Sequence, residues 1–194
     1  MSLTGIEPKV LWNNFSKLNA IPRPSKKEER VIAFMIEFGK SLGLETIQDR
    51  IGNVIIKKPA TSGMEQRKTV ILQSHLDMVH QKNASTVSDF DNQGIEMIID
   101  GDWVKANGTT LGADNGIGMA SALAILGADD IVHGPLEVLL TIDEEAGMTG
   151  AFGLEAGMLD AEILINTDSE QEGEIYMGCA GGVDAQLSVP MVWQ

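Results

Sequence analysis

Histidine and acidic residues gather where a predicted strand ends and where a predicted helix begins. His75 and Asp77 come just after the run TVILQ (residues 69–73), and Asp114 opens an alanine-rich segment. Because side chains alternate along an extended strand, His75 and Asp77 should point the same way. Imidazole and carboxylate groups bind divalent metals, and a carboxylate beside a ligating imidazole fixes the tautomer of the ring. These residues could therefore form part of a metal site.

Further acidic residues follow two other apolar runs. Glu144 and Glu145 come directly after LEVLLTID (residues 136–143), and Asp168 follows ILINT (residues 163–167). Adjacent side chains on a regular backbone project in different directions, so one glutamate could ligate a metal while the other faces a water. If these acids converge with the histidine, they would form a two-metal hydrolase site with one carboxylate left as a base.

Each of these groups taken alone has a simpler structural interpretation. His75 could be a buried histidine that is satisfied by ordinary hydrogen bonds, and Asp114 could be the N-cap of a helix. The two adjacent glutamates could be solvated in a loop, and Asp168 could be a turn residue. These separate interpretations do not explain why the groups all fall at the ends of different strands and at a helix start, so the pattern favours a shared site.

The elements that must position these residues alternate between helices and strands. Helical patterns cover residues 8–18, about 25–42 and 113–126, whereas β-branched runs predict strands over 53–58, 69–73, 136–142 and 163–166. Ser25 and Glu28 have the spacing of a capping box at the start of the second helix, and Gly43 should end it. This alternation predicts an α/β fold with helices on both faces of the sheet. In such folds ligands bind beyond the carboxyl ends of the strands, where the polar clusters fall.

The composition limits the classes of function. The chain has 194 residues, of which 43% are hydrophobic, and this content can fill a core. Its 14 basic and 28 acidic residues give a net charge of −14, which disfavours nucleic acid and anionic membrane surfaces as partners. The sequence has neither an apolar stretch of about 20 residues nor a secretory leader, so a cytoplasmic location is expected. Because Cys179 is its one cysteine, any metal must be held by histidine and carboxylate groups.

Four segments, read together, resemble one enzyme family: SHLDMVHQKN, NGTTLGADNGIGMA, LLTIDEEAGMTGA and NTDSEQEGEIYMGCAGG, in this order. Over essentially its whole length the chain resembles the bacterial aminoacyl-histidine dipeptidases, also called Xaa-His dipeptidases or carnosinase-like enzymes, of the co-catalytic zinc metallopeptidase family M20. The resemblance implies a zinc-peptidase-like catalytic domain, which is a mixed sheet with helices on both faces. It also implies four metal ligands: His75, Asp114, Glu145 and Asp168.

The same resemblance implies further roles within this site. Asp114 would bridge two ions and would precede a cis peptide bond to Asn115. Asp77 would orient His75, and Glu144 would act as the general base. The two divalent ions would be zinc, with cobalt and manganese as the alternatives.

The reaction implied by the resemblance is the hydrolysis of dipeptides, preferentially those with a carboxyl-terminal histidine such as β-alanyl-histidine. The partner would be a small peptide substrate, and the full-length form would be a homodimer. Related tripeptidases and amino-acid deacylases have similar metal sites and remain an enzymatic alternative. An alternative of a different class is a non-catalytic fragment that binds metal without turnover.

The resembled family also sets an expectation for the length of the chain. Its members are more than twice as long, with a lid domain inserted in the catalytic domain and a final histidine ligand near the carboxyl terminus. Residues 1–181 would be the amino-terminal part of the catalytic domain, and residues 182–194 would begin a lid that is otherwise absent. Gly181 and Gly182 would form the hinge before an alternating stretch from Val183 to Val192. One metal would lack a ligand, so we expect little or no dipeptidase activity from this chain alone.

Overall fold

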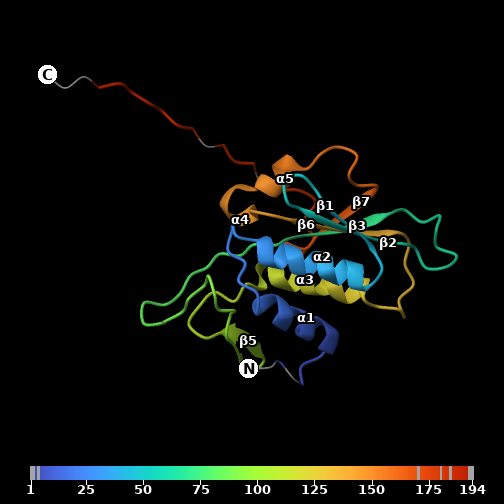
Figure 1. Ribbon diagram of the computed structural model, residues 1–194, viewed down its shortest axis with the longest axis horizontal. Coiled ribbons are helices and arrows are strands. Elements are labelled where there is room, and N and C mark those ends of the chain that lie inside the picture. Colours follow the sequence, from blue (N-terminus) through green and yellow to red (C-terminus); the bar gives the residue numbers. More distant parts are fainter. Residues whose placement is uncertain (1–2, 4, 170, 180, 184, 192–194) are drawn as a thin grey trace.

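A mixed β-sheet forms the centre of the fold (Figure 1). The computed structural model describes residues 3, 5–169, 171–179, 181–183 and 185–191. Within these residues the main sheet has the strand order β1 (Glu45–Gln48), β2 (Val54–Lys58), β6 (Leu136–Thr141), β3 (Val70–His75) and β7 (Ile163–Asn166). Strand β2 is antiparallel to both β1 and β6, whereas β3 runs parallel to both β6 and β7. The carboxyl ends of β6, β3 and β7 therefore meet at one edge of the sheet.

The register of the parallel strands brings their carboxyl ends close together. His75 lies opposite Thr141 of β6, and Gln73 lies opposite Asn166 of β7. Five of the six residues of β6 are buried, as expected for an aliphatic strand with neighbours on both sides. The segments that follow β3, β6 and β7 consequently leave the sheet beside one another.

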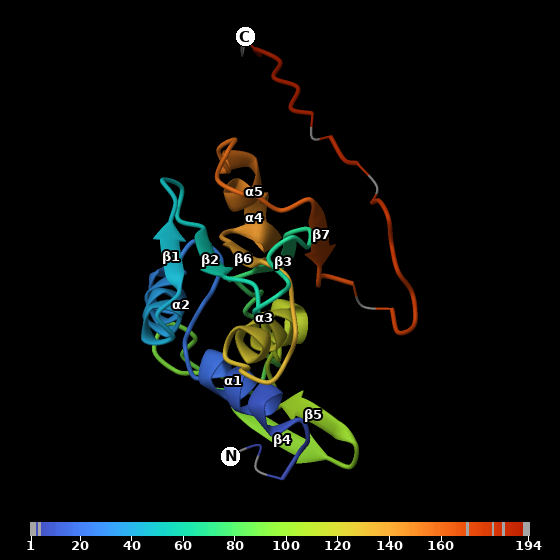
Figure 2. The same cartoon turned by 90° about the vertical axis from the view of Figure 1, so that its right-hand side faces the viewer.

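Helices α1 (Lys9–Asn19), α2 (Glu29–Ser41) and α3 (Ala113–Leu126) lie on one face of the sheet (Figures 1 and 2). Their apolar sides pack against the sheet in a core whose fully buried members include Phe15, Met35, Ile56, Met119 and Leu140. Removal of this apolar surface from water is the main driving force for the association of helices and sheet.

Short helices and a loop lie on the opposite side of the sheet. Figure 2 shows α4 (Glu144–Gly147) and α5 (Thr149–Gly153) on this side. The segment 154–161 packs its apolar residues on a second group of buried strand residues, Ile55, Ile71 and Leu139. The predicted mixed sheet with helices on both faces is therefore confirmed.

A separate hairpin that the sequence analysis did not predict lies beside α1 (Figure 2). It consists of β4 (Met97–Asp100) and β5 (Trp103–Ala106), which are antiparallel. The turn between them contains Gly101 with a φ of +60°, a conformation that glycine adopts without a steric penalty. The sequence MIIDGDWV has the Asp-Gly turn between apolar residues that is typical of a hairpin, so this signal was available.

The capping box predicted at Ser25 and Glu28 is wrong. Helix α2 begins four residues later, at Glu29, and its N-cap makes no side-chain hydrogen bond. The Ser25 hydroxyl instead donates to Asp77 Oδ2 at 2.7 Å, and Glu28 Oε1 accepts the backbone N–H of Asp143 at 2.9 Å. Glu28 Oε1 also accepts the backbone N–H of Lys26 at 2.9 Å, so this carboxylate joins a local turn to the backbone after β6, whereas Ser25 bonds to a partner distant in sequence.

The carboxyl-terminal stretch forms neither helix nor strand in the described residues 181–183 and 185–191. Residues 184 and 192 of the predicted alternating stretch lie outside the described residues, and the division at residue 181 stays a prediction.

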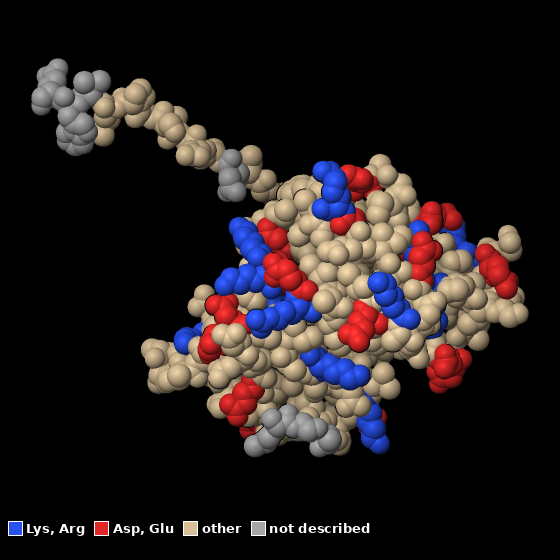
Figure 3. Space-filling model, viewed as in Figure 1, with Lys and Arg blue, Asp and Glu red and all other residues tan. Residues whose placement is uncertain are grey.

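On the face drawn in Figure 3, acidic and basic side chains lie interspersed. None of the helices in the described part of the chain has the length and apolar character needed to cross a membrane.

Candidate metal centre

His75 lies at the centre of a cluster of carboxylates at the edge where the parallel strands end. Its side chain is buried, and its Nε2 atom lies 2.8 Å from Asp114 Oδ1 and 3.6 Å from Asp168 Oδ1. The ligand atoms that these three residues can offer all lie within 4.8 Å of one another. The structure thus brings together three of the four metal ligands implied by the sequence resemblance.

Asp114 reaches the cluster from an irregular start of helix α3. Gly112, with a φ of +69°, precedes it, and Asp114 itself has the non-helical angles φ −80° and ψ 116°. The peptide bond between Asp114 and Asn115 is cis, which confirms the expectation drawn from the resemblance. The N-cap of α3 is Gly112, and the side-chain hydrogen bond that the structure gives Asp114 is the one with His75 Nε2 rather than with a backbone N–H of the helix, so the alternative interpretation of Asp114 as a helix cap does not hold.

The side chain of Asp77 is fully buried and contacts both His75 and the backbone of helix α4. Its Oδ1 atom lies 3.3 Å from His75 Nδ1, and its backbone carbonyl oxygen lies 3.1 Å from the same nitrogen, while the orienting role of Asp77 stays a prediction. The same carboxylate also accepts the backbone N–H of Glu144 at 3.0 Å and that of Glu145 at 3.2 Å. These contacts join the residues after β3 to the first turn of α4, and the hydroxyl of Ser25 donates to the same carboxylate.

The two adjacent glutamates form a second cluster with the histidine. His75, Glu144 and Glu145 can offer ligand atoms that lie within 4.8 Å of one another. Glu145 is therefore grouped with His75 and Glu144 rather than with the two aspartates of the first cluster. Glu144 is partly buried and Glu145 is exposed, so the interpretation of both as solvated loop acids does not describe Glu144.

Two further polar residues contact Asp168 or its partner, and the sequence analysis assigned neither of them a side-chain role in the site. Asn115 donates its Nδ2 hydrogen to Asp168 Oδ1 at 2.9 Å, and Thr167 Oγ1 donates to Asn115 Oδ1 at 3.1 Å. Thr167 also shares a hydrogen bond of 2.8 Å with Ser74 on β3. The available signal was their position next to candidate ligands, in ADNG and in NTD.

The carboxylates strongly perturb the titration of the buried histidine. Burial alone lowers the pKa of His75, but hydrogen bonds with the surrounding carboxylates, that of Asp168 first, outweigh it and raise the pKa to about 11. Burial likewise raises the pKa of Asp77, but hydrogen bonds from His75 and Ser25 outweigh it and lower the pKa to about 2. The imidazolium and the Asp77 carboxylate thus stabilise each other's charge.

The remaining acids of the site are less well compensated. Burial raises the pKa values of Asp114, Glu144 and Glu145, whereas a hydrogen bond with His75 lowers the pKa of Asp168. A raised carboxyl pKa means that the charged form is poorly solvated, a cost that a nearby cation offsets. One imidazole among several carboxylates is a donor set that fits zinc, cobalt or manganese.

Comparison with known families and proteins finds similarity to peptidases. Residues 71–186 match the sequence model of Peptidase family M20/M25/M40. The chain is 60% identical over 182 residues to the cytosol non-specific dipeptidase of Escherichia coli (strain K12), an alignment that covers 94% of this chain and 38% of that protein.

Solved structures of peptidases are also similar to this chain. The crystal structure of aminoacylhistidine dipeptidase from Vibrio alginolyticus superimposes with a TM-score of 0.88 at 60% identity, covering 90% of this chain and 36% of that one. A tripeptidase from Staphylococcus aureus superimposes with a TM-score of 0.70 at 25% identity, covering 83% of this chain and 43% of that one. The chain therefore spans less than half of the length of each of these relatives.

Proposed function

The chain belongs to peptidase family M20/M25/M40, and we propose that residues 1–181 are the amino-terminal part of the catalytic domain of a metal-dependent dipeptidase. Residues 182–194 would begin the lid of that enzyme. The observation that carries the proposal is the convergence of His75, Asp114 and Asp168, whose ligand atoms lie within 4.8 Å of one another. The identity of 60% to a dipeptidase, over 94% of this chain, supports the class of reaction.

We assign the candidate residues to two divalent ions. His75, Asp114 and Asp168 would hold one ion, and Glu145 with a bridging Asp114 would contribute to the other. Bound zinc, or cobalt or manganese in its place, supplies Lewis-acid activation of water and of the peptide carbonyl. The short distance of 2.8 Å between His75 Nε2 and Asp114 Oδ1 supports a shared site, because both groups turn their ligand atoms to the same point.

The protein groups around the ions would then position the water and move its proton. Asp77 holds the imidazole of His75 in one orientation. Glu144 would accept a proton from the attacking water and pass it to the leaving amine, a role typically worth about 10² to 10⁴ in rate. Burial raises the pKa of Glu144, which brings a carboxyl group closer to the pKa that such a base needs. The Asp77 contacts to the backbone of α4 would fix where this base stands.

The substrate that we propose is a dipeptide, preferentially one with a carboxyl-terminal histidine such as β-alanyl-histidine. The name of the Vibrio relative, an aminoacylhistidine dipeptidase, supports the histidine preference, and the name of the Escherichia coli relative supports a cytosolic location. A tripeptidase is the second candidate, because a tripeptidase structure superimposes with a TM-score of 0.70.

Metal content and turnover test the proposal separately. The purified chain is saturated with zinc, cobalt or manganese, desalted and submitted to elemental analysis, where retention of less than about a tenth of an equivalent would contradict the metal site. The full-length form is then assayed on β-alanyl-histidine, a dipeptide without histidine, a tripeptide and an acylated amino acid. Faster turnover of the tripeptide or of the acylated amino acid would replace the dipeptidase assignment, and metal without any turnover would favour a binding role.

A further inference from the structure

Arg23 is a fully buried cation beneath the candidate metal centre, and it bonds to two of the loops that carry ligands. Its Nη1 atom donates to the carbonyl oxygens of Leu76 at 3.1 Å and Asp77 at 2.8 Å, directly after His75. Its Nη2 atom donates to the carbonyl oxygen of Gly112 at 2.7 Å, two residues before Asp114. One guanidinium group therefore joins the end of β3 to the start of α3.

The backbone around Arg23 is shaped to admit this group. A Cβ atom at Gly112 would lie 2.7 Å from Arg23 Nη2, and one at Gly116 would lie 2.9 Å from the same nitrogen and 2.8 Å from the ring of Phe15. Real Cβ contacts are longer, and the atom nearest to the Cβ position at Gly112 is Met78 Sδ at 2.6 Å, so a larger residue at either glycine would crowd Arg23 together with Met78 or Phe15. Gly112 also has a φ of +69°, which by itself favours glycine. The two glycines on either side of Asp114 therefore leave space for Arg23 and its neighbours.

The residues after Arg23 contact the same centre from their own side. The carbonyl oxygen of Arg23 accepts the N–H of Met78 at 3.1 Å, and Pro24 forms a parallel bridge with Met78. Ser25 then donates to Asp77, and Glu28 accepts the N–H of Asp143, which precedes the glutamate pair. The positioning strap, which we define as residues 23–28, therefore bonds to the loops of all the candidate ligands except Asp168.

We propose that the positioning strap sets the spacing between the ligand-bearing loops, and that Arg23 is its principal positioning residue. This inference rests on the metal site of the proposed function. A guanidinium has five donors in a fixed planar fork, so it can hold carbonyl groups of two loops at a set separation. The single Nζ of lysine has three donors but lacks the fixed spacing between two nitrogen atoms. Burial lowers the pKa of Arg23 to about 10, although the charges of Asp77 and Asp114 favour its charged form. Burial of a cation costs free energy of solvation, and an apolar side chain would avoid this cost but could not donate hydrogen bonds to the three carbonyl oxygens.

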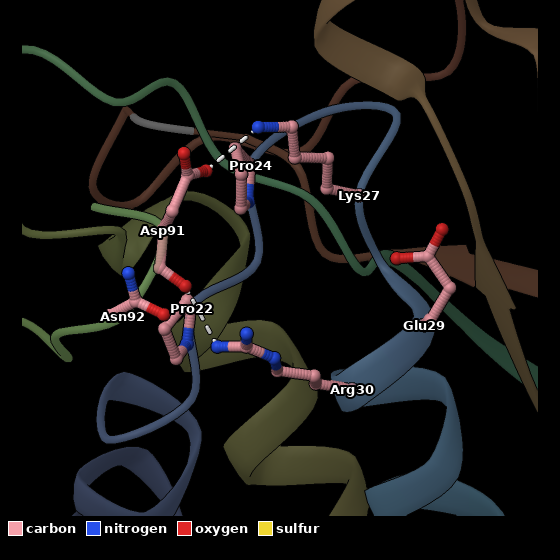
Figure 4. Close-up of a pocket in the computed structure, with 7 residues that line it drawn as sticks. All are labelled: Pro22, Pro24, Lys27, Glu29, Arg30, Asp91 and Asn92. Atoms are coloured by element: carbon pink, nitrogen blue, oxygen red, sulfur yellow. Dashed lines mark hydrogen bonds and ion pairs between the residues drawn. The ribbon is translucent and has the colours of Figure 1, made fainter. Parts of the chain in front are cut away.

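The test compares Arg23→Lys with a matched change at Arg30. Arg30 is exposed and donates its Nη1 hydrogen to the carbonyl oxygen of Asp91 at 2.8 Å, in a loop without a candidate ligand (Figure 4). Both variants are titrated with Co²⁺ against a competing chelator, and the visible absorption of the bound Co²⁺ reports the coordination geometry. Loss of groups that orient metal ligands typically weakens binding by about 10- to 100-fold, so we expect this loss and an altered spectrum for Arg23→Lys. Arg30→Lys should stay within about twofold of the wild type, because its contact is at the surface.

Circular dichroism at the titration temperature establishes that each variant is folded. If Arg23→Lys does not fold, Ser25→Ala decides, because it removes only the hydroxyl that donates to Asp77 and should weaken Co²⁺ binding by about threefold or more. A lower melting temperature together with unchanged Co²⁺ affinity and spectrum in the folded variants would mean that the strap is purely structural, and would overturn the inference. If the wild-type chain itself fails to bind Co²⁺, the metal site of the proposed function is wrong and the inference falls with it.

Discussion

Asp77→Asn is the most direct perturbation of the candidate centre, because it replaces one carboxylate oxygen by an amide nitrogen and preserves the shape. Asp77 Oδ1 receives the N–H of Glu144 and faces His75, whereas Oδ2 receives the hydroxyl of Ser25 and the N–H of Glu145. Both oxygens thus face donors. In either orientation of the asparagine side chain, the amide nitrogen would face a backbone N–H, and it could not accept a hydrogen bond from that group.

The structure gives two routes to the size of the effect. The pKa of Asp77 falls from 3.8 to about 2, and at about 1.4 kcal/mol per unit the charged carboxylate stabilises the folded state by about 2 kcal/mol relative to its protonated form. A hydrogen bond to a charged group contributes about 1.5–3 kcal/mol, and the variant loses one or two of them. We expect Asp77→Asn to lower the free energy of unfolding of the metal-free chain by about 2–5 kcal/mol. At about 2–4 °C per kcal/mol, the melting temperature should fall by roughly 4–20 °C.

Urea unfolding of the chain in the presence of a chelator measures this difference. Because the pKa of Asp77 is lowered, its stabilisation is complete above pH 3.8 and is lost as the pH falls towards 2, so the two proteins should converge in that window. Asp91→Asn is the control, since this carboxylate forms an exposed ion pair with Lys27 that is worth about 1 kcal/mol at most. A difference below about 1 kcal/mol at pH 7, or one that grows on acidification, would refute the reasoning.

Further predictions address the base, the histidine and the packing. In the full-length form, Glu144→Gln should keep its metal and its KM while kcat falls by about 10² to 10⁴. Glu145→Ala should instead lose metal. Elemental analysis and kinetics measure both effects, and the reverse pattern would exchange the two roles. Binding of one Zn²⁺ at pH 8 should release about one proton, because a pKa of about 11 keeps His75 charged until the metal binds. Calorimetry in buffers of different ionisation enthalpy measures this release, and its absence would contradict the raised pKa. Gly150→Ala should lower the free energy of unfolding by about 1–3 kcal/mol, because its Cβ would lie 2.6 and 2.7 Å from backbone atoms just after β6. Gly178→Ala, which has open space around it, should match the wild type in urea, and equal midpoints for both variants would disprove the packing argument.

The elements that carry the candidate ligands could be predicted because their patterns are local. The helix over 113–126 and the strand over 163–166 have the predicted bounds, and β3 and β6 differ from the prediction by one or two residues. Runs of β-branched and aliphatic residues specify a buried strand through their own side chains, whatever the neighbours are. The parallel pairing of these strands then accounts for the convergence of His75 with Asp168.

The contacts that stabilise the centre could not be predicted in the same way, because each joins residues far apart in sequence. Ser25 and Glu28 match a capping box locally, yet the donors and acceptors of the site lie more than 50 residues away and replace it. Arg23 has no pattern of its own in the sequence. Its role becomes visible only when three backbone carbonyls of two loops surround one guanidinium.

The topology of the sheet explains why this edge, and not a single motif, carries the chemistry. Neighbouring strands lie about 4.8 Å apart, so residues that follow adjacent parallel strands come within reach of one ion. His75 ends β3, Glu144 follows β6 and Asp168 follows β7, and these strands are neighbours that run in the same direction. In an antiparallel arrangement, alternate strands would end at the opposite edge and the donors would be separated. The same geometry makes the register decisive, because a slip of one residue in β7 would turn Asp168 to the other face of the sheet and remove it from the cluster.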